Sequence, residues 1–288
     1  MNWRVKNAKY IREGEVYLDF GFLKKWNSEI REQNRKKEGA QYVYPESFIR
    51  FCSVLKIVFK IGYRQVKGVL QGLQQEFPIP AIVSYSQLQR RITRLSLDLV
   101  EELGTPQDAQ IIAIDSTGIK LYNSGEWIRE KHKKRKPFLK LHIAVNTKTK
   151  QAVSYEITED SVGDNKVALK LVDKARKVKR VAKALMDGAY DTYNIWKGLN
   201  ARAIKPVIKL RKNCRINKKS PCRSQAVKCF RENEENWKNA NQYGQRWQVE
   251  TWYSVFKTRF GEYVYSKKPE NVLHEILMKI CLCNKLIV

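Results

Sequence analysis

The chain has 288 residues, of which 43% are hydrophobic, so it can bury a core and is not expected to be disordered. Its 56 Lys and Arg exceed its 29 Asp and Glu, and the formal net charge of +27 favours a phosphate-rich partner, that is, nucleic acid. No apolar run could cross a bilayer and no signal-peptide stretch is visible, so we expect a cytoplasmic protein with no membrane association.

The first hundred residues have the pattern of a helical region. Helices are predicted at 47–59, after Pro45, and at 63–77, after Gly62. A third helix is predicted at 84–95, with a serine as its cap. It carries long polar side chains that suit a major-groove recognition helix, namely Gln87, Arg90, Arg91 and Arg94. The pattern favours a helix-turn-helix-like DNA-binding module over an ordinary surface helix.

The pattern changes after residue 105, where strands and helices alternate. We expect a strand at 110–115, a hairpin at 138–147 and 152–158, a helix at 165–177 capped by Asp164, a strand at 181–187, a helix at 192–200 and a strand at 203–210. A basic loop at 211–228, a long helix ending at 260 and a closing helix at 270–286 complete the series. This element order predicts an α/β fold with an RNase H-like mixed sheet flanked by helices.

Cysteines are concentrated in the predicted basic loop, which contains Cys214 and Cys222, with Cys229 just beyond it. These three could bind a metal. However, the six cysteines of the chain include no CxxC pair, and only three histidines are present. Reduced structural thiols are therefore the favoured interpretation.

Two predicted strands end in a carboxylate, at Asp115 and at Asp187. An acidic side chain at the end of a buried strand is held rigidly at the rim of a sheet, which is a suitable position for a metal ligand. Small or turn-forming residues follow each one and leave room for a substrate. Either Asp taken alone could equally be a helix cap or a turn former, and the pair strengthens the functional interpretation.

The long helix carries a polar stripe formed by Tyr243, Arg246, Glu250 and Lys257. On an α-helix these positions fall within about 60° of one another, and their chemistry is not that of a core face. Trp247, together with Trp252 and Phe256, would lie off the stripe and pack the helix down. The alternative is an exposed face on which Arg246 and Glu250 form a simple i, i+4 ion pair.

The spacing Tyr243-(2)-Arg246-(3)-Glu250-(6)-Lys257 resembles the Y-(2)-R-(3)-E-(6)-K signature of DDE transposases in the insertion-sequence four/five superfamily. The segments beginning at Ile114 and at Met186 resemble the first and second Asp motifs of that superfamily, and 70–95 is similar to its DNA-binding region. Gly163 stands where a His is common before Asp164, which leaves the role of Asp164 open.

The resemblance implies an N-terminal helical DNA-binding region at 1–104. An RNase H-like catalytic domain follows at 105–288, with a short basic insertion at about 211–235. It implies a metal-dependent transposase that cuts the ends of an insertion sequence and joins them to target DNA. Asp115, Asp187 and Glu250 would be both the catalytic residues and the ligands of two Mg²⁺ ions, with Mn²⁺ as a substitute. Tyr243, Arg246 and Lys257 would contact DNA.

The expected partner is double-stranded DNA, both the terminal inverted repeats of the element and the target. We expect a homodimer or larger assembly on DNA, located at the nucleoid of a prokaryotic cell. The main alternative is a catalytically inactive or domesticated sequence-specific DNA-binding protein. A nuclease of the same fold that cuts without joining, and a basic RNA-binding protein without catalysis, are further alternatives.

Overall fold

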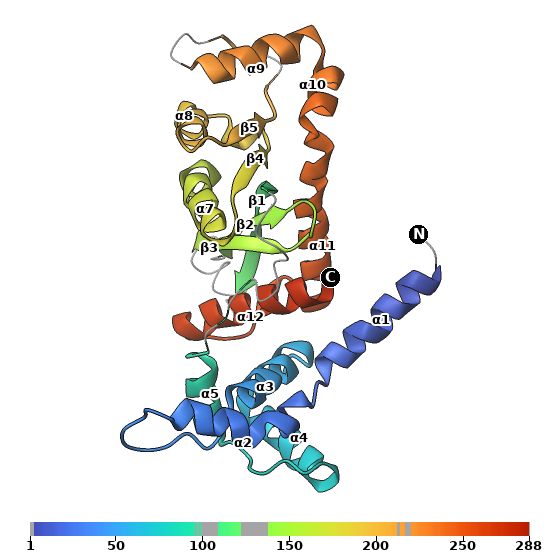
Figure 1. Ribbon diagram of the computed structural model, residues 1–288, viewed down its shortest axis with the longest axis vertical. Coiled ribbons are helices and arrows are strands. Elements are labelled where there is room, and N and C mark those ends of the chain that lie inside the picture. The colour runs from blue at the N-terminus through green and yellow to red at the C-terminus, as the bar shows by residue number, and fades with distance from the viewer. Residues whose placement is uncertain are drawn as a thin grey trace, which may run out of the picture. The chain divides into compact units, whose positions relative to one another are not determined.

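The computed structural model describes residues 3–95, 97, 99, 109–121, 138–211, 214–216 and 220–287 (Figure 1). By its internal contacts the chain divides into two compact units. One consists of Met1–Leu97 with Tyr265–Leu286, and the other of Asp98–Val264 with the final two residues. The predicted boundary between 104 and 105 falls outside the described residues. Among the described helices, none has the length and apolar character needed to cross a membrane.

The first unit is helical. Its elements are α1 (Trp3–Tyr17), α2 (Gly21–Asn34), α3 (Glu46–Val58), α4 (Tyr63–Glu76), α5 (Tyr85–Ile92) and α12 (Pro269–Ile287). The predicted helices at 47–59, 63–77, 84–95 and 270–286 are therefore present, and Ser84 caps α5 by accepting a hydrogen bond from the Gln87 backbone. The assignment of α3, α4 and α5 as a helix-turn-helix-like module stays a prediction.

The core of this unit is aromatic. Phe22 and Trp26 of α2 pack against Phe48 of α3, with ring centroids 5.2 and 5.0 Å away. The helix α12 joins the same unit through buried charges, because Glu275 pairs with Lys279 at 2.9 Å and lies 3.6 Å from Lys56 of α3. A helix far away in the sequence thus completes the N-terminal core.

The second unit contains one mixed sheet. Its strands are β1 (Gln110–Leu121), β2 (Phe138–Asn146), β3 (Ala152–Glu159), β4 (Val181–Met186), β5 (Lys205–Ile208) and β6 (Tyr263–Val264). Within the described residues the order is β3-β2-β1-β4-β5, with β6 pairing with β1. The strands β1 to β3 are antiparallel neighbours, whereas β4 and β5 run parallel to β1. The predicted mixed sheet flanked by helices is confirmed.

Helices cover both faces of this sheet, with α7 (Asp164–Val178) and α8 (Tyr193–Ala201) on one side and α11 (Trp247–Phe260) on the other (Figure 1). Ser154 of β3 donates a hydrogen bond to the Leu171 carbonyl of α7, so Ser154 and its cross-strand partner Ala144 face α7. The next residue, Ile143, pairs with Asp115. Because side chains alternate along a strand, Asp115 faces α11.

Some element boundaries differ from those predicted. The strand β1 does not end at Asp115 but continues to Leu121, because β2 pairs with it as far as Lys120. Asp164 is not the cap of α7 but its first residue, because Gly163 has the extended backbone of the cap position. Part of the expected loop at 211–228 is instead a helix, α9 (Pro221–Glu232), which begins with a proline at a position where no backbone donor is needed.

The long C-terminal helix is also interrupted. It consists of α10 (Glu234–Asn241), the 3₁₀ turn η2 (Tyr243–Arg246) and α11. Gln242 ends α10 with a φ of 57°, a left-handed conformation that closes a helix. The prediction that Tyr243, Arg246, Glu250 and Lys257 form a stripe on one continuous helix was therefore wrong, since the first two lie on the turn.

Candidate active site

The strand register aligns the two predicted catalytic aspartates. Parallel pairing of β1 with β4 sets Ala113 opposite Leu185, and Asp115 and Asp187 each follow two residues later. Asp187 keeps an extended backbone, with a φ of −80° and a ψ of −180°. Since alternation repeats every two residues, both carboxylates are placed on the face of the sheet that α11 covers. The strand pairing thus brings together two positions that are distant in the sequence.

The carboxylate of each aspartate is oriented by a backbone N–H group that follows it closely in the sequence. The Asp115 carboxylate accepts a hydrogen bond from the Ser116 backbone at 2.8 Å. The Asp187 carboxylate accepts one from the Ala189 backbone at 2.9 Å, in the 3₁₀ turn η1 (Gly188–Tyr190). Asp187 therefore does cap the η1 turn, which was the alternative interpretation of this residue. A cap of this kind orients the side chain and does not exclude a functional role.

Glu250 lies in the first turn of α11, where the positive end of the helix dipole favours a carboxylate. Arg246 forms an ion pair with Glu250, and another nitrogen of its guanidinium lies 3.9 Å from the Asp115 carboxylate. The i, i+4 ion pair between Arg246 and Glu250, which was the alternative interpretation, is therefore present. The same arginine also lies close to Asp115 on β1. Arg246 therefore connects Asp115 to Glu250.

Tyr243 contacts both the strand that leads to Asp187 and the Arg246 side chain. Its side chain is buried, and its hydroxyl donates a hydrogen bond of 3.3 Å to the Met186 carbonyl, directly before Asp187. The Arg246 guanidinium lies over the Tyr243 ring, 5.9 Å from its centroid. Residues three apart share one side of a 3₁₀ turn, so this contact survives the interruption of the helix. Lys257 lies further along α11 and pairs with Glu262 at 3.1 Å.

The electrostatics of Asp115 reflect a crowded acidic site. Burial, and then the charges of Asp187 and Glu250, raise the pKa of Asp115 to about 6, against the opposing effects of the Ser116 hydrogen bond and Arg246. Within the described part of the chain, no three His, Cys, Asp or Glu side chains are grouped closely enough to hold a metal ion as they stand. The donor chemistry nevertheless suits a hard divalent cation, because mutual repulsion among carboxylates is relieved by such an ion.

Two tyrosines that the sequence interpretation missed also belong to this region. The Tyr253 hydroxyl of α11 lies 2.9 Å from the carbonyls of Asp115 and of Leu141, so it ties α11 to β1 and β2. Tyr190 is 1% exposed, and its hydroxyl has no hydrogen-bond partner among the described residues. Its pKa is raised well above the usual value by burial and then by the charges of Asp115, Asp164 and Asp187. The burial of Tyr253 could have been inferred from its helical spacing with Val249 and Phe256.

The packing residues predicted on α11 divide into two groups. Trp252 and Phe256 are each 1% exposed, as expected. Trp247 is 65% exposed, so the prediction that it packs the helix down was wrong. The reason is that α11 begins at Trp247, where the chain has just left the 3₁₀ turn. A large exposed indole therefore lies between Arg246 and Glu250 in the sequence.

The predicted DNA-contacting residues of the first unit all lie on or directly after α5. Gln87, Arg90 and Arg94 are exposed. Arg91 is half-buried, donates a hydrogen bond of 3.1 Å to the Tyr44 carbonyl and lies over the Tyr42 ring at 4.5 Å. Arg91 thus has a structural role inside its own unit, and the exposed three are the better placed to reach a ligand.

Comparisons with known proteins identify the family. A family model described as a transposase DDE domain matches residues 106–285, and a second with the same description matches 11–124. The fold is similar to that of a piggyBac transposase synaptic complex with hairpin DNA, with 11% identity, 96% of this chain and 74% of that chain covered and a TM-score of 0.42.

Two further solved structures are also similar to the chain, with lower TM-scores. One is a Drosophila P element transposase strand transfer complex, with 14% identity, 90% and 69% coverage and a TM-score of 0.38. The other is a simian T-cell lymphotropic virus intasome in complex with a PP2A regulatory subunit, with 13% identity, 69% and 68% coverage and a TM-score of 0.26. These scores are low, and the assignment depends on the family model, which spans more than half of the chain. The chain therefore belongs to the family of transposases with a DDE domain, and its activity is DNA transposition by polynucleotidyl transfer.

Proposed function

We propose that the chain is a transposase of the insertion-sequence four/five superfamily, which cuts the ends of its element and transfers the freed 3′ ends to target DNA. Asp115, Asp187 and Glu250 are the catalytic carboxylates. The observation that carries this proposal is the arrangement around Arg246, which connects Glu250 to Asp115, while the register of β1 and β4 aligns Asp115 with Asp187. The strand order β3-β2-β1-β4-β5 is that of an RNase H-like sheet and supports the same proposal.

Proteins of this family use divalent metal ions, and Mg²⁺ fits the three carboxylates proposed here, with Mn²⁺ as a substitute. Asp115, Asp187 and Glu250 would together hold the ions. When bound, the two ions activate the attacking oxygen and stabilise the leaving oxygen of an in-line displacement. The carboxylates leave positions for water and phosphate, because three side chains cannot saturate two such ions.

The cationic residues of the site would bind the DNA backbone. Arg246 and Lys257 lie on the segment that carries Glu250, and both are held by carboxylates that a phosphate can replace, namely Glu250 and Glu262. Gln87, Arg90 and Arg94 would contact the terminal inverted repeat, with Arg91 supporting α5 from within. A homodimer or larger assembly would hold two element ends, and the expected location is the nucleoid of a prokaryotic cell.

The test compares native protein with Asp115→Asn on a labelled duplex that carries the end of the element, with Mg²⁺ or Mn²⁺. We expect the native chain to nick the duplex at the element end and to join the freed end to a second duplex. Asp115→Asn should bind the same duplex with unchanged affinity and leave it intact. Cleavage by Asp115→Asn at the native rate with either ion would contradict the assignment of the catalytic residues.

A further inference from the structure

A second buried carboxylate lies four residues after Asp187. Asp191 has only 5% of its side chain exposed, yet it is not part of the proposed catalytic set. One of its oxygens accepts a hydrogen bond of 2.8 Å from the Trp196 indole of α8. The two oxygens together accept a bidentate pair from the Arg223 guanidinium of α9, both at 2.7 Å. Both oxygens of Asp191 therefore accept hydrogen bonds, and the donors come from two different helices.

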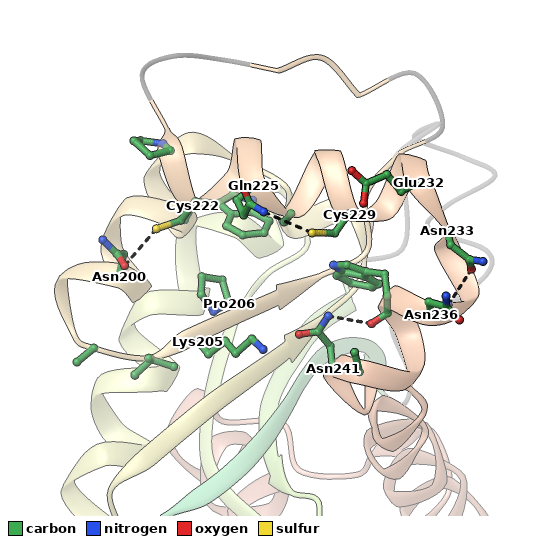
Figure 2. A pocket seen from close by; sticks show the side chains of 17 residues that line it. Asn200, Lys205, Pro206, Cys222, Gln225, Cys229, Glu232, Asn233, Asn236 and Asn241 are labelled. Carbon is green, nitrogen blue, oxygen red and sulfur yellow. Dashed lines mark hydrogen bonds between the residues drawn. The ribbon is translucent and has the colours of Figure 1, made fainter.

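A cavity of about 1070 Å³ lies between α8, β5, α9 and α10, and Figure 2 shows its lining. At one side of it, the thiol of Cys222 on α9 donates a hydrogen bond of 3.3 Å to Asn200 on α8. Thiol hydrogen bonds are weak, and a cavity wall lacks packing contacts. The charged pair between Arg223 and Asp191 thus joins α9 to the η1 segment through two charge-assisted hydrogen bonds, which are stronger than a thiol hydrogen bond.

The connection reaches Asp187 through a short, closed turn. The residues between the two aspartates form η1, in which the Tyr190 backbone donates to the Asp187 carbonyl at 3.3 Å and the Asp191 backbone to the Gly188 carbonyl at 3.4 Å. The side chain of Tyr190 is buried, so the turn cannot rotate without disturbing the core. A shift of Asp191 is therefore transmitted to Asp187.

We propose that Asp191 and Arg223 are a positioning pair for the transposition reaction, which holds Asp187 in register with Asp115 by fastening the η1 turn to α9. Neither residue touches the reacting atoms. The proposal rests on the proposed function, in which Asp187 is a metal-binding carboxylate. It assigns a role in catalysis to the segment that separates β5 from Glu250, because Arg223 lies in that segment.

The test uses the variants Asp191→Asn and Arg223→Gln and the double variant that carries both. Single-turnover cleavage, the Mn²⁺ concentration for half-maximal rate, the Kd for the element end and the shift in melting temperature produced by Mn²⁺ are measured for each. Groups that orient metal ligands change metal affinity or activity by about 10–100-fold when they are removed. We expect Asp191→Asn to raise the half-maximal Mn²⁺ concentration by about tenfold and to reduce the Mn²⁺-induced shift, with Kd for DNA unchanged.

The double variant should recover part of this loss. Asp191→Asn alone leaves the Arg223 guanidinium without its carboxylate, although one of its nitrogens still donates to the Arg215 carbonyl at 2.8 Å. The double variant removes both charges, so no buried charge is left without a counter-charge. If a variant fails to fold, Arg223→Lys takes its place, because it keeps the charge and loses the bidentate geometry. It should show an intermediate increase in the Mn²⁺ requirement.

The pair of Asp173 with Arg202 is a control that matches the geometry, although the Asp173 side chain is 43% exposed and that of Asp191 only 5%. It has the same bidentate geometry, with both bonds at 2.7 Å, but joins α7 to the end of α8 away from η1. Asp173→Asn should leave the Mn²⁺ requirement unchanged. If Asp191→Asn behaves like Asp173→Asn, with a lower melting temperature but native metal dependence, the pair is only structural. Asp187→Asn separates the two proposals, because native activity in that variant would overturn the proposed function itself.

Discussion

The Arg246 guanidinium lies 3.9 Å from the Asp115 carboxylate while it also forms an ion pair with Glu250. These carboxylates come from opposite ends of the catalytic unit, one from its first strand and one from its last helix. A guanidinium can serve two carboxylates because it presents several donors in a rigid plane. The arginine of the Y-R-E-K spacing therefore organises the acidic site, in addition to the contact with DNA proposed for it.

This double contact predicts that Arg246→Lys is not a conservative change. An ammonium is a point charge and cannot reach both carboxylates in a fixed plane. A hydrogen bond to a charged group contributes about 1.5–3 kcal/mol, so the rate of cleavage should fall by roughly 10–100-fold. Single-turnover cleavage at saturating Mg²⁺ measures the effect. Arg176→Lys, on the exposed part of α7, is the control, and equal rates for the two variants would contradict the role of Arg246.

Tyr253 gives a prediction about stability together with activity. Tyr253→Phe removes the hydroxyl that lies 2.9 Å from the Asp115 and Leu141 carbonyls. The loss of this buried bond should lower the free energy of unfolding by about 1–3 kcal/mol and also slow cleavage, because α11 loses its tie to β1. Urea unfolding and a cleavage assay measure the two effects. Tyr193→Phe, on an exposed side chain, should change neither, and native stability in Tyr253→Phe would refute this account.

Trp247 should matter for DNA binding and not for folding. Its indole is 65% exposed, so Trp247→Ala should leave the melting temperature unchanged. Stacking of a base on an aromatic side chain contributes about 1–3 kcal/mol, so Kd for the element end should rise by a corresponding factor. Trp252→Ala is the opposite control, because that side chain is 1% exposed and its loss should destabilise the fold by about 3–5 kcal/mol. An unchanged Kd in Trp247→Ala would rule out the contact.

The buried charges of the first unit predict a pH dependence of stability. Burial alone would raise the pKa of Glu275, but Lys279, Lys56 and the Ser266 hydroxyl outweigh it and lower this pKa to about 2. A carboxyl with a lowered pKa stabilises the fold above its unfolded value, near 4.5, and this contribution is lost as the pH falls toward 2. The loss should be on the order of 3 kcal/mol, because one pKa unit corresponds to about 1.4 kcal/mol.

Chemical unfolding from neutral pH down to the pKa of Glu275, about 2, measures this contribution. Glu275→Gln should be less stable than the native chain at neutral pH, because Lys279 is left buried beside a neutral partner. It should also show a shallower decline in acid. Glu46→Gln breaks a pair with Arg50 that is much more exposed than the Glu275 pair, and should do neither. A Glu275→Gln variant with the native pH profile would show that another group causes the decline.

Periodicity and turn chemistry predicted most helices and strands of the catalytic unit, but not where some of them end or are interrupted. The alternation in β2 and β3 and the apolar run before Asp187 correspond to observed strands. The break at Gln242 could not be predicted, because its left-handed backbone is adopted by a residue that does not usually prefer it. The helix α9 was also missed, since only Val227 and Phe230 are buried in it and its pattern is mostly polar.

For the site, spacing together with the resemblance to a family signature predicted the Tyr243-Arg246-Glu250-Lys257 segment and the two aspartates, and their catalytic role stays a prediction. What spacing could not supply is the register of β1 with β4, because strand pairing between distant segments depends on the whole sheet. The same limit applies to Asp191, which resembles an ordinary loop residue until Arg223 and Trp196 are brought to it by the fold. Tyr190 and Tyr253 acquire their environments only through helix packing against the sheet.

The central claim is that Glu250 completes a metal-dependent site for cutting DNA. The most direct measurement is cleavage of a labelled duplex carrying the element end, with Mg²⁺, by the native chain and by Glu250→Gln. The amide keeps the shape of the side chain and can still accept from Arg246, but it loses the charge that a metal ligand needs. The account predicts specific nicking by the native chain and none by Glu250→Gln, with equal binding. Equal nicking by both proteins would contradict it.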